Sequence, residues 1–215
     1  GLGVPKDDAQ AAGWYIKAAG AGDVPSMRVV GVRYMEGQGV SKDCAEALSW
    51  SRKAADAGDA MAMTNVGVAY KEGMGVPVDY AQALIWYRKA ADAGDAAGMN
   101  DLGVMYINGQ GVPKDEAQGL VWYRKASDAG NGIAMRNLGE IYGGGIGVPK
   151  DDVQAAAWYR KAADLGDPVS MRYMGNVYET GTGVPKDLDQ AVDWYRKAAS
   201  AGDTASAEAL TRLGK

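Results

Sequence analysis

The sequence predicts an all-α protein, a solenoid of antiparallel helix pairs that repeat every 36 residues. Tryptophan occurs only at this spacing, at Trp14, Trp50, Trp86, Trp122, Trp158 and Trp194. A Gly-Val dipeptide recurs in the same step, with its valine at Val4, Val40, Val76, Val112, Val148 and Val184. A fixed period without insertions is typical of repeat arrays, in which each unit packs mainly on its neighbours.

The first helix of each period is predicted from its cap and its apolar spacing. Asp115 precedes Gln118 by three residues, the pattern of a capping box in which both side chains satisfy backbone groups. Small and aromatic residues then follow at helical spacing, for example Ala83, Trp86 and Ala90. A lysine near the end of each such helix suits the negative end of the helix dipole.

The second helix begins directly after the first. A glycine such as Gly94 ends the first helix, and the residue after it, here Asp95, can cap the second. A turn this short makes the two helices antiparallel. The second helix carries methionine, glycine and tyrosine at fixed positions, for example Met63, Gly67 and Tyr70. Glycine within a helix costs about 1 kcal/mol relative to alanine, so we expect another helix backbone or a tryptophan to pack against it.

Composition narrows the functional classes. The net charge of −4 comes from 23 basic and 27 acidic residues that are interspersed, so we expect no nucleic-acid partner. Histidine is absent, which removes the commonest general base and metal ligand. Cys44 is the only cysteine, and no apolar run approaches the ~20 residues of a membrane-spanning helix. We therefore expect no enzymatic activity, no cofactor, no metal and no membrane insertion.

The repeated positions that could suggest chemistry have structural explanations. The Gly-x-Gly segments follow predicted helices without a preceding strand, which favours linkers over phosphate-binding loops. One methionine per unit at a fixed position favours a core residue over a soft-metal ligand. The recurring aspartates fall at cap positions, which favours capping over catalysis or calcium binding. Cys44 is expected in the first turn of a helix, but without a histidine partner a nucleophilic role is not favoured.

These residues resemble the Sel1-like repeat, a relative of the tetratricopeptide repeat. The family pattern is present at Leu102, Gly103, Tyr106, Gly109, Gly111, Val112, Asp115 and residues 122–126. The resemblance covers essentially the whole chain and implies a right-handed α/α superhelix. It divides a single solenoid, residues 1–215, into a leading helix at 7–21, five full units at 24–59, 60–95, 96–131, 132–167 and 168–203, and a trailing helix at 204–215.

The resemblance implies a non-enzymatic scaffold or adaptor that binds a partner protein or an extended peptide along its concave groove. Some bacterial relatives are secreted and Cys-rich and are linked to β-lactam binding. A β-lactam-binding or hydrolase-like protein is thus one alternative, although the paired cysteines of that branch are missing here. An engineered consensus-like scaffold is another, although Ser51, Gly119 and Gly143 look like natural drift. Because Gly1 enters within a repeat, we expect an excised fragment; a periplasmic or secreted location would suit a bacterial origin, and the oligomeric state stays open.

Specific binding is expected where the units differ, on the helix that carries methionine, glycine and tyrosine. By analogy with tetratricopeptide arrays, this helix lines the concave face. Three residues before its glycine stand Arg28, Thr64, Asn100, Arg136 and Arg172. One residue after it stand Val32, Val68, Val104, Glu140 and Asn176. Four and five residues after it stand Met35 and Glu36, Lys71 and Glu72, Ile107 and Asn108, Gly143 and Gly144, and Glu179 and Thr180.

The predicted groove is apolar in its N-terminal half and polar at its other end, where Tyr173 lies near the arginines. Arginine can hold a carboxylate through two parallel hydrogen bonds. An acidic peptide or a C-terminal carboxylate is therefore the expected guest. The alternative is that these arginines are solvated surface residues.

Overall fold

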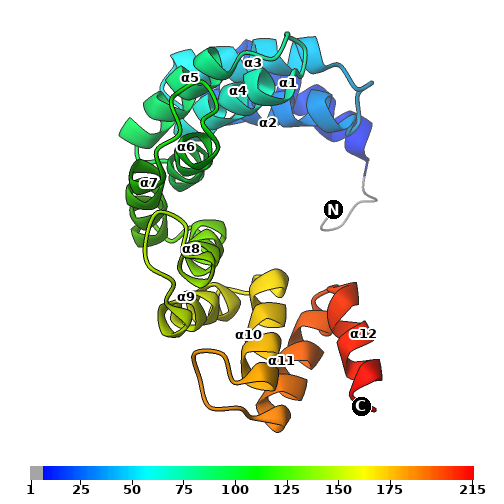
Figure 1. Cartoon of the computed structure of the whole chain (residues 1–215). Helices are drawn as coiled ribbons and strands as arrows, with labels where there is room; N and C mark the ends of the chain where they lie inside the picture. Colours follow the sequence, from blue (N-terminus) through cyan, green and yellow to red (C-terminus); the bar gives the residue numbers. More distant parts are fainter. Residues whose placement is uncertain (1–6) are drawn as a thin grey trace. The chain divides into compact units, whose positions relative to one another are not determined.

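The structure, a computed structural model, describes residues 7–215, and these form twelve α-helices without a strand (Figure 1). In chain order the helices are α1 (Asp8–Gly20), α2 (Val24–Glu36), α3 (Cys44–Asp56), α4 (Ala60–Glu72), α5 (Tyr80–Asp92), α6 (Ala96–Asn108), α7 (Glu116–Asp128), α8 (Gly132–Gly144), α9 (Asp152–Asp164), α10 (Pro168–Thr180), α11 (Leu188–Ser200) and α12 (Thr204–Arg212). The predicted all-α class and the helix pairs are confirmed. Val4, the first valine of the Gly-Val series, lies outside the described residues.

The helices belong to two compact units, one ending at Lys114 and the other beginning at Asp115. The first unit contains α1–α6 and the second α7–α12. Within each unit, successive helices pack on one another along the chain, and α4 also contacts α6. That the whole chain forms a single array stays a prediction.

Aspartate caps the helices, as the sequence predicts. The Asp115 side chain accepts a hydrogen bond from the Gln118 N–H at 2.9 Å, and Asp95 accepts one from the Gly98 N–H at 2.9 Å. The capping box is only half formed at four of the first helices, however. The backbone N–H of a capping aspartate such as Asp151 donates to the carbonyl of a tyrosine, Tyr142, at 2.9 Å. The same bond forms at Asp43, Asp79 and Asp187, and it joins the helix start to the helix before it.

A tyrosine of the following helix covers the glycine within the second helix. A Cβ atom added to the glycine would lie 2.5–2.6 Å from the ring in three pairs, Gly67 with Tyr87, Gly139 with Tyr159, and Gly175 with Tyr195. The expected tryptophan or helix backbone is therefore wrong for these three copies. Near Gly31, Ser51 replaces the tyrosine, and the added Cβ would lie 2.7 Å from the Ser51 Oγ and 3.2 Å from the Ala47 carbonyl oxygen. There the helix backbone does come close.

A lysine from the next helical turn lies over the ring of each tryptophan. The lysine Nζ lies 3.9–4.6 Å from the ring centroid in all six copies, consistent with cation–π attraction. Trp194 is also covered by the guanidinium of Arg160 at 4.8 Å and is 6% exposed. Trp14 is 65% exposed, because no described helix precedes α1. Packing of the tryptophan thus depends on the preceding repeat.

Replacing Gly175 with alanine should destabilise the fold, although alanine is the better helix former. The added methyl group would overlap the ring of Tyr195, which is fully buried and has its hydroxyl between two polar side chains. We expect a loss of about 1–3 kcal/mol in the free energy of unfolding, measured by urea denaturation.

The matched control is Gly143→Ala in α8. There the added Cβ would meet the Ala155 Cβ at 3.5 Å, an ordinary contact. This variant should gain up to about 1 kcal/mol of stability from helix propensity. Equal stabilities for the two variants would contradict the packing role of the tyrosine.

Candidate functional site

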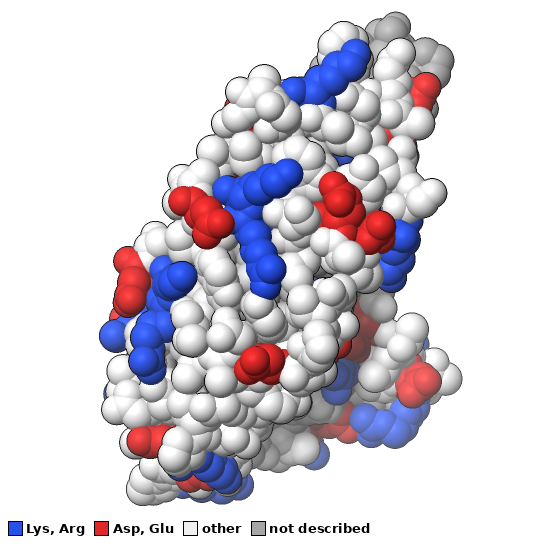
Figure 2. All heavy atoms as spheres, turned by 90° about the horizontal axis from the view of Figure 1, so that it is seen from above, with Lys and Arg blue, Asp and Glu red and all other residues white. Residues whose placement is uncertain are grey.

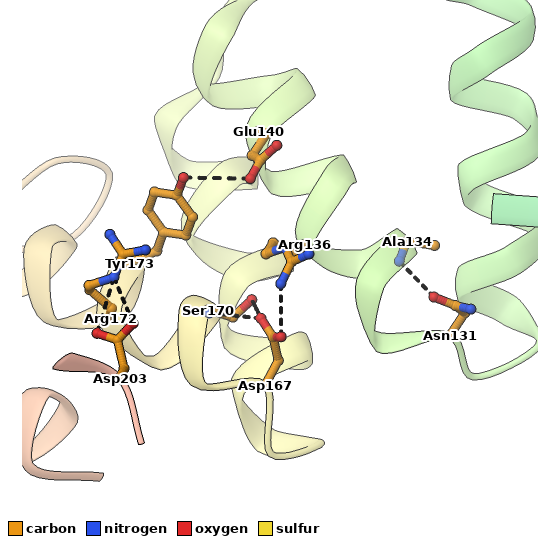
Figure 3. Close-up of polar contacts among 9 residues, drawn as sticks. All are labelled: Asn131, Ala134, Arg136, Glu140, Asp167, Ser170, Arg172, Tyr173 and Asp203. Atoms are coloured by element: carbon orange, nitrogen blue, oxygen red, sulfur yellow. Dashed lines mark hydrogen bonds and ion pairs between the residues drawn. The ribbon is translucent and has the colours of Figure 1, made fainter. Parts of the chain in front are cut away.

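The predicted site residues lie on the second helix of each pair. In the first unit these helices are α2, α4 and α6, and in the second unit α8 and α10. The positions three before and one after the glycine are four residues apart, so they share one face of each helix. The structure brings together Arg136, Glu140, Arg172 and Tyr173 in the second unit, as Figure 3 shows.

The side chain three residues before the glycine reaches the aspartate that caps the next second helix. The contacts are Arg28 Nε to Asp59 at 3.0 Å, Thr64 Oγ1 to Asp95 at 2.6 Å, Arg136 Nη1 to Asp167 at 2.9 Å and Arg172 Nε to Asp203 at 3.2 Å. Figure 3 shows the last two pairs. Asn100, at the same position in α6, donates to Asp101 at 3.4 Å.

Each of these cap carboxylates joins two repeats. Asp167 accepts hydrogen bonds from the Ser170 N–H at 2.8 Å and the Ser170 hydroxyl at 2.6 Å, besides its contact with Arg136. Asp203 is bound in the same way by Ser206 and Arg172. Burial opposes the charged form, yet these hydrogen bonds favour it more, and the pKa of Asp203 lies below its usual value.

The arginines therefore have a structural role that the sequence did not predict. The side chains of Arg136 and Arg172 are 22% and 29% exposed, so they are partly buried bridges between repeats. Binding of a partner's carboxylate by these groups stays a prediction. It would require each guanidinium to serve two carboxylates, which its five N–H donors allow.

The residue after the glycine is more open to a partner in the second unit. Glu140 and Asn176 are exposed, whereas Val32, Val68 and Val104 are partly buried. Figure 2 shows basic and acidic side chains scattered among uncharged residues over the face in view. The accessible positions are thus polar on α8 and α10.

Tyr173 fills the space between α8, α9 and α10. Its ring stacks on Tyr159 with centroids 4.4 Å apart, and its hydroxyl donates to Glu140 at 3.5 Å. The Arg172 guanidinium lies 5.4 Å from the Tyr173 ring. Burial, and then the negative charge of Glu140, raise the pKa of Tyr173 above its usual value. The hydroxyl therefore acts as a donor at neutral pH.

A second polar network joins α10, α11 and α12. The Tyr195 hydroxyl lies 2.5 Å from Asn176 Oδ1 and 2.7 Å from Glu179 Oε2. Arg212 binds Glu179 through two hydrogen bonds of 2.6 and 2.8 Å, which hold the pKa of Glu179 below its usual value. Arg212 was not among the predicted site residues, because none was predicted on the trailing helix. Its signal was available, since Arg212 stands 36 residues after Asn176.

The position two residues before the glycine was also missed, except at Tyr173. In α6 this residue is Asp101, and its partial burial raises its pKa to about 6, with Lys71 acting in the opposite direction. The fully buried Tyr87 hydroxyl has no hydrogen-bond partner in the part of the chain that the structure describes. Burial raises the pKa of Tyr87, and the charges of Asp101 and Glu72 add to this. Comparing copies 36 residues apart would have revealed Asp101.

Residues 7–215 contain no cluster of histidine, cysteine, aspartate or glutamate suited to a metal ion. Over the same range, every helix is too short or too polar to span a bilayer.

Replacing Asp101 with asparagine should stabilise the protein at neutral pH. The folded-state pKa of about 6 exceeds the ordinary value of 3.8, so the wild-type folded state gains stability as the pH falls through 6 and takes up the proton. The variant has no such proton to bind. Its advantage, about 1–2 kcal/mol above pH 7, should shrink towards pH 4.5 in urea unfolding. The exposed Asp128→Asn is the control, and an advantage independent of pH would contradict the assignment.

The Sel1 repeat family matches residues 1–23, 24–59, 60–95, 96–131, 132–167 and 168–203. A Sel1 repeat protein from Oxalobacter formigenes has 34% identity and a TM-score of 0.88, over 95% of this chain and 84% of that one. A protective antigen of uropathogenic Escherichia coli with an SLR fold has 38% identity and a TM-score of 0.80, over 94% of this chain. This chain spans only 44% of that antigen.

Helicobacter pylori cysteine rich protein B is 27% identical with a TM-score of 0.51, over 62% of this chain and 96% of that one. Comparison with curated proteins finds no match. The family match extends over almost the whole sequence, and both its period and its helix pairs agree with the fold described above. The chain belongs to the Sel1 repeat family.

Proposed function

We propose that the chain is a non-enzymatic interaction scaffold that binds a partner protein or an extended peptide along the face of its even-numbered helices. Sel1 repeats commonly serve as protein-interaction scaffolds. The proposal rests on the observation that constant and variable positions of each repeat have different roles. The constant residues cap and pack the helices, whereas the exposed positions after the glycine differ, as at Glu140 and Asn176.

The polar groups of this face support binding rather than catalysis. Arg136 and Arg172 bridge repeats, and Arg212 is held by Glu179. A catalytic acid or base must exchange protons with a substrate, whereas these groups are fixed in charged pairs. Such pairs create an ordered surface of mixed charge, which suits specific recognition of a polar segment.

The second unit has the surface best suited to an extended peptide. Glu140 and Asn176 are exposed, one turn along α8 and α10 from the bridging arginines. An asparagine amide can donate to and accept from a peptide backbone, and a carboxylate can accept from its N–H groups. A guest carboxylate, as in an acidic peptide or a C-terminus, would use the remaining donors of Arg136 and Arg172.

The test is a charge reversal at Glu140. The partner is first isolated by affinity capture from the source organism, and its affinity is then measured with purified proteins by calorimetry. We expect Glu140→Arg to weaken binding by about tenfold or more, because a contact at the centre of an interface changes sign.

The control is Asp128→Arg, which makes the same change of charge at an exposed position on α7. Reversing Arg136 or Arg172 would be less informative, because a glutamate there would face Asp167 or Asp203 and break the bridge between repeats. If the partner bound wild type, Glu140→Arg and Asp128→Arg equally well, the proposed surface would be wrong.

A further inference from the structure

A pocket of about 340 Å³ opens between α10, α11 and α12 in the second unit. Its lining includes Arg172, Asn176, Tyr195, Ala205, Ala209 and Arg212. The volume lies at the lower end of the range for sites that bury a small ligand, about 300–1,000 Å³. The two alanines of α12 leave this space open, and the larger Glu208 and Arg212 complete the lining from the same helix.

The preceding repeat shows what fills the equivalent space. Moving back by 36 residues replaces Ala209 with Tyr173, Tyr195 with Tyr159 and Asn176 with Glu140. There the Tyr173 ring stacks on Tyr159 and its hydroxyl reaches Glu140. The pocket beside α12 therefore lies where the preceding repeat carries the Tyr173 ring, although here the face of Tyr195 is already covered.

The walls of the pocket favour an aromatic guest over an aliphatic one. The Arg172 guanidinium is held by Asp203 at 3.2 Å, and that of Arg212 is held by Glu179 at 2.6 and 2.8 Å. Guanidinium groups attract the faces of aromatic rings, and Arg172 already lies 5.4 Å from the Tyr173 ring. The methyl groups of Ala205 and Ala209 would contact an aliphatic guest as well as an aromatic one. The two guanidinium groups would attract only the aromatic ring.

Two differences from the preceding repeat narrow the chemistry expected of the guest. Tyr195 is fully buried, so a guest ring would pack on the Arg212 guanidinium instead of a tyrosine face. Asn176 replaces Glu140, and its amide brings an N–H₂ donor that the carboxylate lacks. A guest hydroxyl would therefore accept a hydrogen bond here, whereas the Tyr173 hydroxyl donates one.

We propose that this pocket receives an aromatic side chain, preferably tyrosine, from a partner peptide bound along α10 and α12. The proposal rests on the proposed scaffold function, and it names one residue type that the partner supplies. Its test uses a small probe, so that it does not depend on knowing the partner.

The experiment is a titration of the full chain with N-acetyl-tyrosinamide, followed by backbone NMR. We expect saturable shifts at Arg172, Asn176 and Ala209 with a Kd in the low millimolar range, as for ligands of this size. N-acetyl-leucinamide should bind about tenfold more weakly, because it lacks the ring that the guanidinium groups attract. Equal shifts with the two probes, or none with either, would overturn the proposal.

Two substitutions on α12 provide matched variants. Ala209→Tyr places in the pocket the residue that the preceding repeat carries, and it should abolish the shifts. Ala207→Tyr adds the same ring at an exposed position outside the pocket lining and should leave them unchanged. Thermal unfolding shows whether each variant folds. A folded Ala209→Tyr variant that bound the probe as wild type does would contradict the proposal.

The reciprocal variant is Tyr173→Ala, which should open a second pocket one repeat earlier and raise the stoichiometry from one probe to two. This measurement stays decisive even if Ala209→Tyr does not fold, because a stoichiometry of one would contradict the equivalence of the two sites. A failure of the probe experiments leaves the scaffold function intact, since the Glu140 charge reversal tests that function separately.

Discussion

The carboxylate at the start of a second helix joins two repeats in four places, and the rest of the structure depends on this contact. In the second unit, Asp167 binds the first turn of its own helix and also the guanidinium of Arg136, which stands 31 residues earlier. One group therefore sets where a helix begins and how far it lies from the preceding one. An inserted residue between donor and acceptor would break the cap or the bridge. This double use constrains the 36-residue spacing in the four repeats where the bridge forms, at Asp59, Asp95, Asp167 and Asp203.

Much of the fold could be predicted because capping and helical periodicity are local properties. Asp115, its turn glycines and the apolar stripe each act within a few residues. The contact between Gly175 and Tyr195 could not be predicted in the same way, because it joins two helices 20 residues apart. Both residues recur in the sequence, but a shared period does not identify which constant side chain touches which.

The candidate site shows a different limit. Variation three residues before the glycine suggested a binding role, yet Thr64 and Arg136 both reach the cap aspartate of the next repeat. A short hydroxyl and a long guanidinium can serve one structural purpose, so variation alone does not identify function. The positions after the glycine are different, because Glu140 and Asn176 reach solvent.

The variable residue two before the glycine changes the surroundings of a buried tyrosine on the preceding helix. Asp101 places a carboxylate whose charge acts on Tyr87, and Tyr173 stacks a ring on Tyr159. At the equivalent position Ala209 leaves a pocket lined in part by Tyr195. The tyrosine ring packs on a glycine that recurs in the repeats. The residues around the ring can therefore change without moving the helices. These three repeats thus place a charge, a ring and a pocket at one equivalent position, although the caps and the packing glycines around it are shared.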